Sequence, residues 1–306
     1  MNSPRRLYLL VPAVAAGLAL AACGEESPSA NTGAPPASSA PPETPPASTP
    51  PTSDPSTPPS SSPGSGGYDH PTGADDVVIQ VGYEGGFVPV GVAFTQVPSV
   101  LITGDGRAIT EGPVPAIYPG PLLPNLVQRT ITEEGIQTLL AKADELGLLA
   151  HVRYGDPSSQ IADAPDTVVS ITVDGTTYRH VAYALGIDPE SDPDRANLFD
   201  FVTAATDLTG TVGADQLGTE GPYESDNYLI RATDVDLSTM DTEVPPTVVR
   251  WPADASVRLA DASECAELSR AEGDALFHDA NQLTFFRQAG VTYSVSATLQ
   301  LPGRSC

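Results

Sequence analysis

One stretch, residues 27–66, limits where this chain can build a folded core. It contains 13 Pro, 11 Ser and 5 Thr, and it lacks any aromatic or large aliphatic side chain. Such a segment cannot bury enough apolar surface to offset the entropy lost when it becomes ordered. With the short polar stretch before it, we predict a disordered, partly polyproline linker over residues 23–66 and a globular domain over residues 67–306.

The residues before the linker have the pattern of an export signal. Arg5 and Arg6 precede an uncharged run over residues 7–22, which is shorter than a membrane span and typical of a signal peptide. The run ends in the sequence LAAC, which resembles the lipobox of bacterial lipoproteins, where the cysteine thiol receives the lipid. We therefore predict a lipoprotein signal peptide over residues 1–22 and lipidation of Cys23. The protein would lie on the extracytoplasmic face of the cell membrane, with the membrane as a partner through the lipid anchor.

Two alternatives stay open for this segment. The first is an ordinary cleaved signal peptide in which Cys23 is incidental. The second concerns the export route, because the sequence RRLYL from Arg5 also resembles a twin-arginine signal. The sequence does not decide between the general secretory and twin-arginine routes.

The charge balance excludes several classes of function. The chain has 14 Lys and Arg against 39 Asp and Glu, a formal net charge of −25. A protein this acidic repels phosphates, so we expect no nucleic-acid partner. Lys142 is the only lysine, and its context matches neither a phosphate-binding loop nor a Ser-x-x-Lys nucleophile.

Strand patterns dominate the domain. Residues 291–299 alternate strictly between apolar and polar side chains, which predicts a half-buried antiparallel strand. Residues 77–83 and 169–173 show a similar alternation. Turns at 105–106, 174–175 and 289–290 predict hairpins.

Three helix starts can also be identified. Thr132, Asp192 and Ser269 are N-cap residue types at the starts of candidate helices. The order of elements predicts an α+β fold with antiparallel sheets and two or three helices. A division of the domain into two small units near residues 210–225 is an alternative arrangement.

A proline-rich stretch over residues 111–124 interrupts these elements. Proline cannot donate a hydrogen bond to a β-ladder, so this stretch cannot be a central strand. We predict a rigid loop over one sheet edge. It serves either as structural cover or as a ligand-facing loop.

Two cysteines are left once Cys23 carries a lipid. Cys265 and Cys306 form an even number outside the cytoplasm, which favours a disulfide bond. The alternatives are a catalytic thiol and a pair of metal ligands. A nucleophilic cysteine needs a nearby histidine or a helix start, and a free thiol at the end of the chain is poorly placed for either.

No catalytic or metal motif stands out. His70, His151, His180 and His278 are isolated in the sequence, and no zinc or cofactor motif occurs. His180 lies within a predicted strand, where a structural role is the expected one. We therefore assign no catalytic, cofactor-binding or metal-binding residues, and we expect no cofactor.

Two acidic runs are candidate calcium sites. Residues 188–194 carry carboxylates at every second position, like the start of an EF-hand loop, but Pro193 replaces the required Gly and Phe199 the final Glu. Residues 234–243 form the second run. A solvated acidic surface is the favoured interpretation of both runs, with Asp192 serving as a helix cap.

Five short stretches carry a resemblance to known proteins: residues 83–89, 104–107, 118–121, 132–136 and 281–284. These stretches resemble uncharacterised secreted proteins and lipoproteins of actinobacteria. The resemblance implies a secreted α+β domain and carries no activity or site. We expect a lipid-anchored binding or scaffolding module whose partner is a cell-envelope protein or glycan. The alternatives are an envelope hydrolase and a calcium-stabilised adhesion module.

Overall fold

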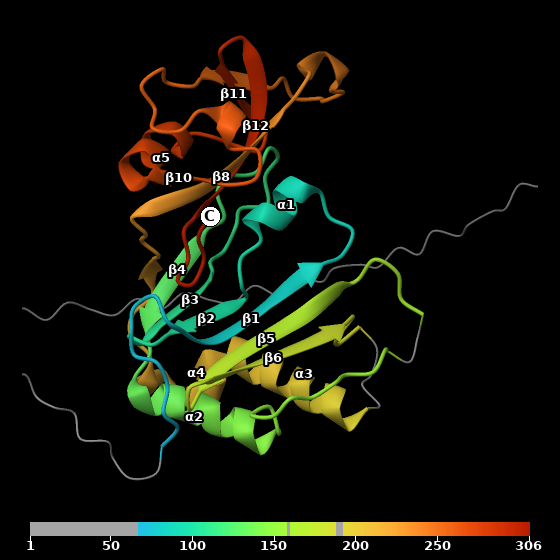
Figure 1. The fold of residues 1–306 in the computed structure, drawn as a ribbon, viewed down its shortest axis with the longest axis vertical. Helices are drawn as coiled ribbons and strands as arrows, with labels where there is room; N and C mark the ends of the chain where they lie inside the picture. The colour runs from blue at the N-terminus through green and yellow to red at the C-terminus, as the bar shows by residue number, and fades with distance from the viewer. Residues whose placement is uncertain (1–66, 158–159, 188–191) are drawn as a thin grey trace, which may run out of the picture. The chain divides into compact units, whose positions relative to one another are not determined.

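The computed structural model describes residues 67–157, 160–187 and 192–306. These residues belong to one compact unit. The predicted signal peptide, Cys23 and the linker lie outside the described residues, as do residues 188–191 of the first acidic run. The fold is α+β with two mostly antiparallel sheets, as the sequence predicted (Figure 1).

The first sheet is antiparallel throughout, with the order β6-β5-β1-β2-β3-β4-β7 in the described part of the chain. Successive residues of a strand face opposite sides of the sheet. In β1, Ile79 and Val81 therefore enter the main core, whereas Gln80 and Gly82 face the other side. The strands are β1 (Val77–Gly85), β2 (Val100–Thr103), β3 (Arg107–Glu111), β4 (Leu126–Thr130), β5 (Pro165–Val173), β6 (Thr176–Tyr183) and β7 (Gly221–Pro222).

Helices cover one face of this sheet (Figure 1). The predicted apolar faces of α2 and α3 are buried there, among them Leu139, Leu140 and Phe201. The opposite face carries a much smaller apolar cluster that includes Leu101, Ile109 and Leu301. This second face, called here the open face, holds the candidate site. The helices of the first layer are α2 (Glu133–Glu145), α3 (Pro193–Thr206), α4 (Leu208–Val212) and the 3₁₀ helix η1 (Ala214–Gln216).

The second sheet has the order β10-β8-β12-β11-β9 among the described residues, with β9 parallel to β11. Trp251 lies in its core, 5.4 Å from the Phe286 ring, and its Nε1 donates to Val257 O at 2.9 Å. The elements are β8 (Asn227–Asp234), η2 (Leu237–Thr239), β9 (Thr247–Arg250), η3 (Leu259–Asp261), β10 (Ala266–Ser269), α5 (Arg270–Phe277), β11 (Thr284–Gln288) and β12 (Val291–Leu299).

The predicted helix starts and hairpins are present. Thr132 accepts from Gly135 N, Asp192 from Asp194 N and Ser269 from Glu272 N. The turns after β5 and β11 use positive φ angles at residues 174–175 and 289–290. In the described residues there are two further short helices that the sequence did not suggest, α1 (Val90–Thr95) and α4.

The proline-rich stretch begins at the last residue of β3, Glu111, and the rest of it connects β3 to β4 without forming a strand. It is not confined to the edge of the first sheet. Pro121 forms a β-bridge with Asn281, just before β11, and Leu122 N donates to Ala280 O at 3.3 Å. The stretch therefore lies against the second sheet, which the local proline pattern could not reveal.

Candidate functional site

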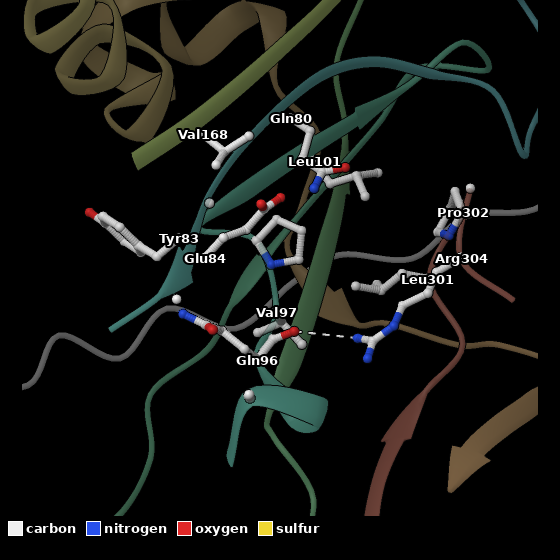
Figure 2. A pocket seen from close by; sticks show the side chains of 15 residues that line it. Gln80, Tyr83, Glu84, Gln96, Val97, Leu101, Val168, Leu301, Pro302 and Arg304 are labelled. Carbon is white, nitrogen blue, oxygen red and sulfur yellow. Dashed lines mark hydrogen bonds between the residues drawn. The ribbon is translucent and has the colours of Figure 1, made fainter. Parts of the chain in front are cut away.

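The open face of the first sheet holds a groove of about 450 Å³. Its floor consists of Gln80 and Gly82 on β1, Leu101 on β2 and Val168 on β5 (Figure 2). The registers Gln80↔Leu101 and Gly82↔Val168 bring these residues together. Gly82 leaves the floor low because it has no side chain, and a Cβ there would lie 3.4 Å from Pro98 Cα.

Two segments form the walls. One is the end of α1 with residues 96–98, and the other is the closing segment, residues 301–304, which follows β12. Arg304 ties these walls together, because its guanidinium donates to Phe94 O and, at 3.3 Å, to Gln96 O. The same guanidinium lies 5.4 Å from the centre of the Phe94 ring. Burial lowers the pKa of Arg304.

Both of the charged side chains at the groove are already engaged. Glu84 accepts from Arg179 Nη2 at 2.7 Å, and the two side chains are about half exposed. Arg304 is held by backbone carbonyls. By contrast, the amides of Gln80 and Gln96 make no hydrogen bond with any described residue. Tyr83 points away from the groove (Figure 2).

The lining limits the chemistry of the groove. Among the described residues that line it there is no His, Cys, Ser, Thr or Lys. A nucleophile and an adjacent base are therefore not brought together here. The groove instead offers two neutral amides, each with donors and an acceptor: Gln80 lies in the floor beside apolar residues, and Gln96 lies in a wall.

A larger hollow of about 1230 Å³ lies on the other side of the closing segment. Its arginines are paired within the protein. Arg107 Nε lies 2.9 Å from Asp105, and Arg270 Nε donates to both carboxylate oxygens of Asp274 at 2.8 Å. These guanidiniums thus serve the fold, and the hollow presents no unengaged arginine to an anion.

Two of the histidines, His180 and His70, have structural partners. His180 is buried on β6, with Nε2 2.8 Å from Leu148 O and Nδ1 2.8 Å from the Tyr154 hydroxyl. The carbonyl can only accept, so Nε2 carries the proton and Nδ1 accepts from Tyr154. Burial lowers the pKa of His180.

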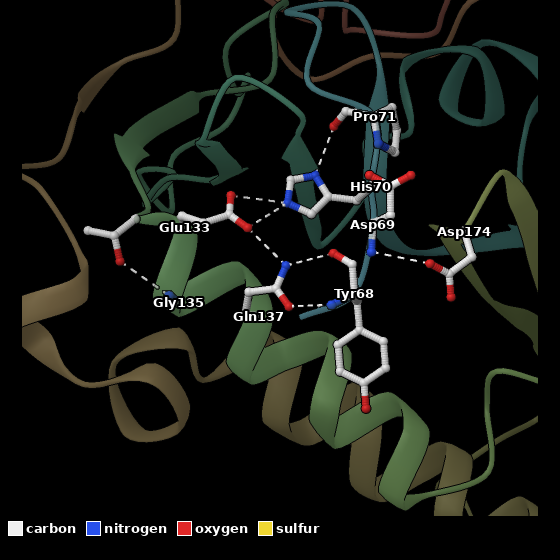
Figure 3. Close-up of polar contacts among 9 residues, drawn as sticks. Tyr68, Asp69, His70, Pro71, Glu133, Gly135, Gln137 and Asp174 are labelled. Atoms are coloured by element: carbon white, nitrogen blue, oxygen red, sulfur yellow. Dashed lines mark hydrogen bonds and ion pairs between the residues drawn. The ribbon is translucent and has the colours of Figure 1, made fainter. Parts of the chain in front are cut away.

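His70 belongs to a strap that fastens the start of the described chain to α2 (Figure 3). Its Nδ1 lies 2.9 Å from Pro71 O, and its Nε2 lies 3.1 Å from the Glu133 carboxylate. Gln137 exchanges two hydrogen bonds with the backbone of Tyr68. His70 therefore helps to hold the first residues of the domain against α2.

The structure describes some of the other predicted sites and not others. Cys265 and Cys306 lie at disulfide distance and are joined in the structure, with Cα atoms 5.5 Å apart. Cys23 and residues 188–191 lie outside the described chain. Asp236 in the second acidic run caps η2 by accepting from Ser238 N at 2.9 Å. Within the described residues, no group of three or more His, Cys, Asp and Glu is placed to hold a metal ion.

Sequence reasoning did not identify the groove. Its residues are ordinary in isolation, and only Gly82 gave a local signal, because glycine inside a strand can mark a close approach. Comparison with protein-family models, curated proteins and solved structures finds no match to this chain. The described residues include no helix long and apolar enough to cross a membrane.

Proposed function

We propose that this chain is a lipid-anchored, non-enzymatic binding module of the cell envelope, and that its groove holds an uncharged, hydroxyl-rich ligand such as a glycan chain. The observation that carries the proposal is a difference between the charged and the neutral polar side chains of the groove. Its charged side chains are engaged within the protein, whereas its two unpartnered polar side chains are neutral amides.

The ligand class follows from those amides. A side-chain amide offers both donors and an acceptor, which suits hydroxyl groups that also donate and accept. Anionic ligands would be repelled by the acidic domain, which carries the chain's excess of Asp and Glu. The volume also lies in the range of small-molecule pockets, about 300–1,000 Å³.

The location rests on the N-terminal pattern. A lipid on Cys23 and a proline-rich linker would hold the domain at the outer surface of the membrane, where envelope glycans are present. Metabolic labelling with a clickable palmitate analogue tests this part. Label on the wild type and none on Cys23→Ser is the expected result, and equal labelling of both chains would contradict it.

The groove is tested separately by calorimetry with soluble glycan strands released from cell walls. Gly82→Val should weaken binding about tenfold or more, because it fills the floor of a pocket that depends on its depth. Gln80→Ala should weaken it about three- to tenfold, the range for one neutral hydrogen bond. Gln160→Ala is the matched control, since Gln160 is an exposed amide that does not line the groove.

The outcomes separate clearly. Equal affinities for wild type and Gly82→Val would show that the groove is not the site. Absence of binding by the wild type would reject glycan strands as the ligand. Circular dichroism and melting temperatures establish that each variant is folded.

A further inference from the structure

A short apolar segment projects from the first sheet beside the groove. We call residues 85–95 the apolar spur; it contains the end of β1 and all of α1. Phe87 is 88% exposed, Val90 61%, Val92 53% and Val88 44%. None of the residues of α1 is buried. Large apolar side chains exposed together in this way mark an interaction surface.

The spur also contains no charged side chain. Residues 85–104 contain no Asp, Glu, Lys or Arg, although the chain as a whole has a net charge of −25. Residues 112–128 are uncharged as well and expose Ile117 and Tyr118, but Leu122 and Leu123 of that stretch pack against the core of the second sheet. The spur makes no comparable contribution to a core.

The spur is held in place by the rest of the fold. Phe87 N donates to Asp163 O at 3.4 Å, and Arg304 binds the carbonyls of Phe94 and Gln96. Gly91 packs so closely on β12 that a Cβ there would lie 2.5 Å from Ser296 Oγ. Its apolar side chains are thus presented in a fixed arrangement, which lowers the ordering cost of binding.

From these observations we infer that the spur inserts into the interfacial region of the lipid bilayer. The inference rests on the lipid anchor of the proposed function, which makes the bilayer the partner at the highest local concentration. A coil of about 40 residues spans on the order of 35 Å, so a tether with the number of residues in 27–66 would let the domain return to the surface that holds it.

The distribution of charge on the domain favours contact with the bilayer through the uncharged spur. An acidic domain is repelled from anionic lipids, and an uncharged apolar segment is the part of its surface that approaches headgroups with the least repulsion. Binding should therefore be driven by apolar contact. This predicts the opposite lipid and salt dependence from that of proteins attached by basic patches.

The first experiment uses the chain from Gly24 onward, which lacks the lipid but contains the whole compact unit. Sedimentation with phosphatidylcholine vesicles should show weak binding. Phe87→Ser with Val90→Ser should reduce the partition coefficient about tenfold or more, because two exposed apolar side chains are lost. Phe199→Ser with Val248→Ser, both residues 41% exposed and outside the spur, should leave it unchanged.

Varying the lipid composition in the same experiment separates apolar from electrostatic binding. Adding phosphatidylglycerol should weaken binding, and salt should restore it by screening the repulsion. Binding that strengthens with phosphatidylglycerol and disappears in salt would overturn the inference. So would the absence of vesicle binding, or equal binding by the Phe87–Val90 double variant.

A second measurement reports directly on the spur. In a Trp251→Phe background, Phe87→Trp should shift its emission to the blue on vesicles and be quenched by brominated lipids, whereas Phe199→Trp should not. Concentration-dependent self-association that is lost with Phe87→Ser, without a vesicle-dependent shift, would instead assign the spur to a second copy of the chain. Because the first experiment omits the lipid, its result does not depend on whether Cys23 is modified.

Discussion

At the scale of single residues, the clearest feature is the buried side chain of His180, in which both ring nitrogens are hydrogen-bonded. Its Nε2–H donates to the Leu148 carbonyl whether or not the ring is charged, whereas Nδ1 accepts from the Tyr154 hydroxyl only while the ring is neutral. Burial is the largest cause of its lowered pKa, and the nearby His151 acts in the same direction. The residue stabilises the fold only while it stays uncharged.

This gives a pH dependence with a definite sign. Because the folded-state pKa lies below the unfolded value of about 6.5, the unfolded chain binds the proton more readily. The free energy of unfolding should be highest above about pH 6.5 and should fall as the pH drops toward the folded-state pKa. Urea unfolding at a series of pH values between 5 and 8 measures this slope.

Substitution isolates the contribution of His180. His180→Gln should lower the free energy of unfolding at pH 7.5 by about 1–3 kcal/mol, the cost of disturbing buried hydrogen bonds. It should also flatten the slope between pH 5 and 7. His278→Gln, at an exposed histidine, is the control and should retain the slope. An unchanged slope in His180→Gln would contradict the assignment.

At the scale of elements, local sequence determined most of what could be predicted. The caps at Thr132, Asp192 and Ser269 act within a few residues, and so do the turns at 174–175 and 289–290. The alternation over residues 291–299 likewise predicted β12. Each of these signals is local in the sequence, which explains why the α+β class was correct.

The groove could not be predicted in the same way. Gln80, Gln96 and Arg304 carry no shared motif, and they meet only through strand register and the return of the chain after β12. The contact of the proline-rich stretch with Asn281 is equally long-range. Side-chain pairing across such separations leaves no periodic signal in one sequence.

The cap of α2 is a direct test at this scale. Thr132→Ala should lower the free energy of unfolding by about 1 kcal/mol, because Gly135 N loses its acceptor. Thr132→Ser keeps the hydroxyl and should restore most of the loss. Urea midpoints for the three proteins decide the matter; equal losses in both variants would assign the effect to the missing methyl group.

At the scale of the whole molecule, the segment after β12 links distant parts of the fold. Tyr223 donates to Gln300 O at 2.8 Å, Arg304 binds carbonyls beside α1, and Cys306 is joined to Cys265 next to β10. The disulfide thus restrains the segment that walls the groove. Stability and groove shape are coupled through it.

Removing the disulfide should expose this coupling. The loop-entropy model for a span of about 40 residues gives a loss of about 4 kcal/mol for Cys265→Ser with Cys306→Ser. Reduction of the wild type should have the same effect, whereas reductant should leave the double variant unchanged. Denaturant titrations measure both, and two free thiols in unfolded, unreduced protein would refute the bond in solution.

The long-range position of the closing segment also sets an order of assembly. A chain is synthesised from its N-terminus, so β1, β2 and β5 emerge well before residues 301–304 are available to them. Until then Leu101 and Ile109 lack the apolar contact that Leu301 makes with them in the complete fold. The incomplete sheet would expose apolar surface that chaperones and proteases can bind. An interrupted chain would therefore expose apolar surface at the place where the ligand is proposed to bind.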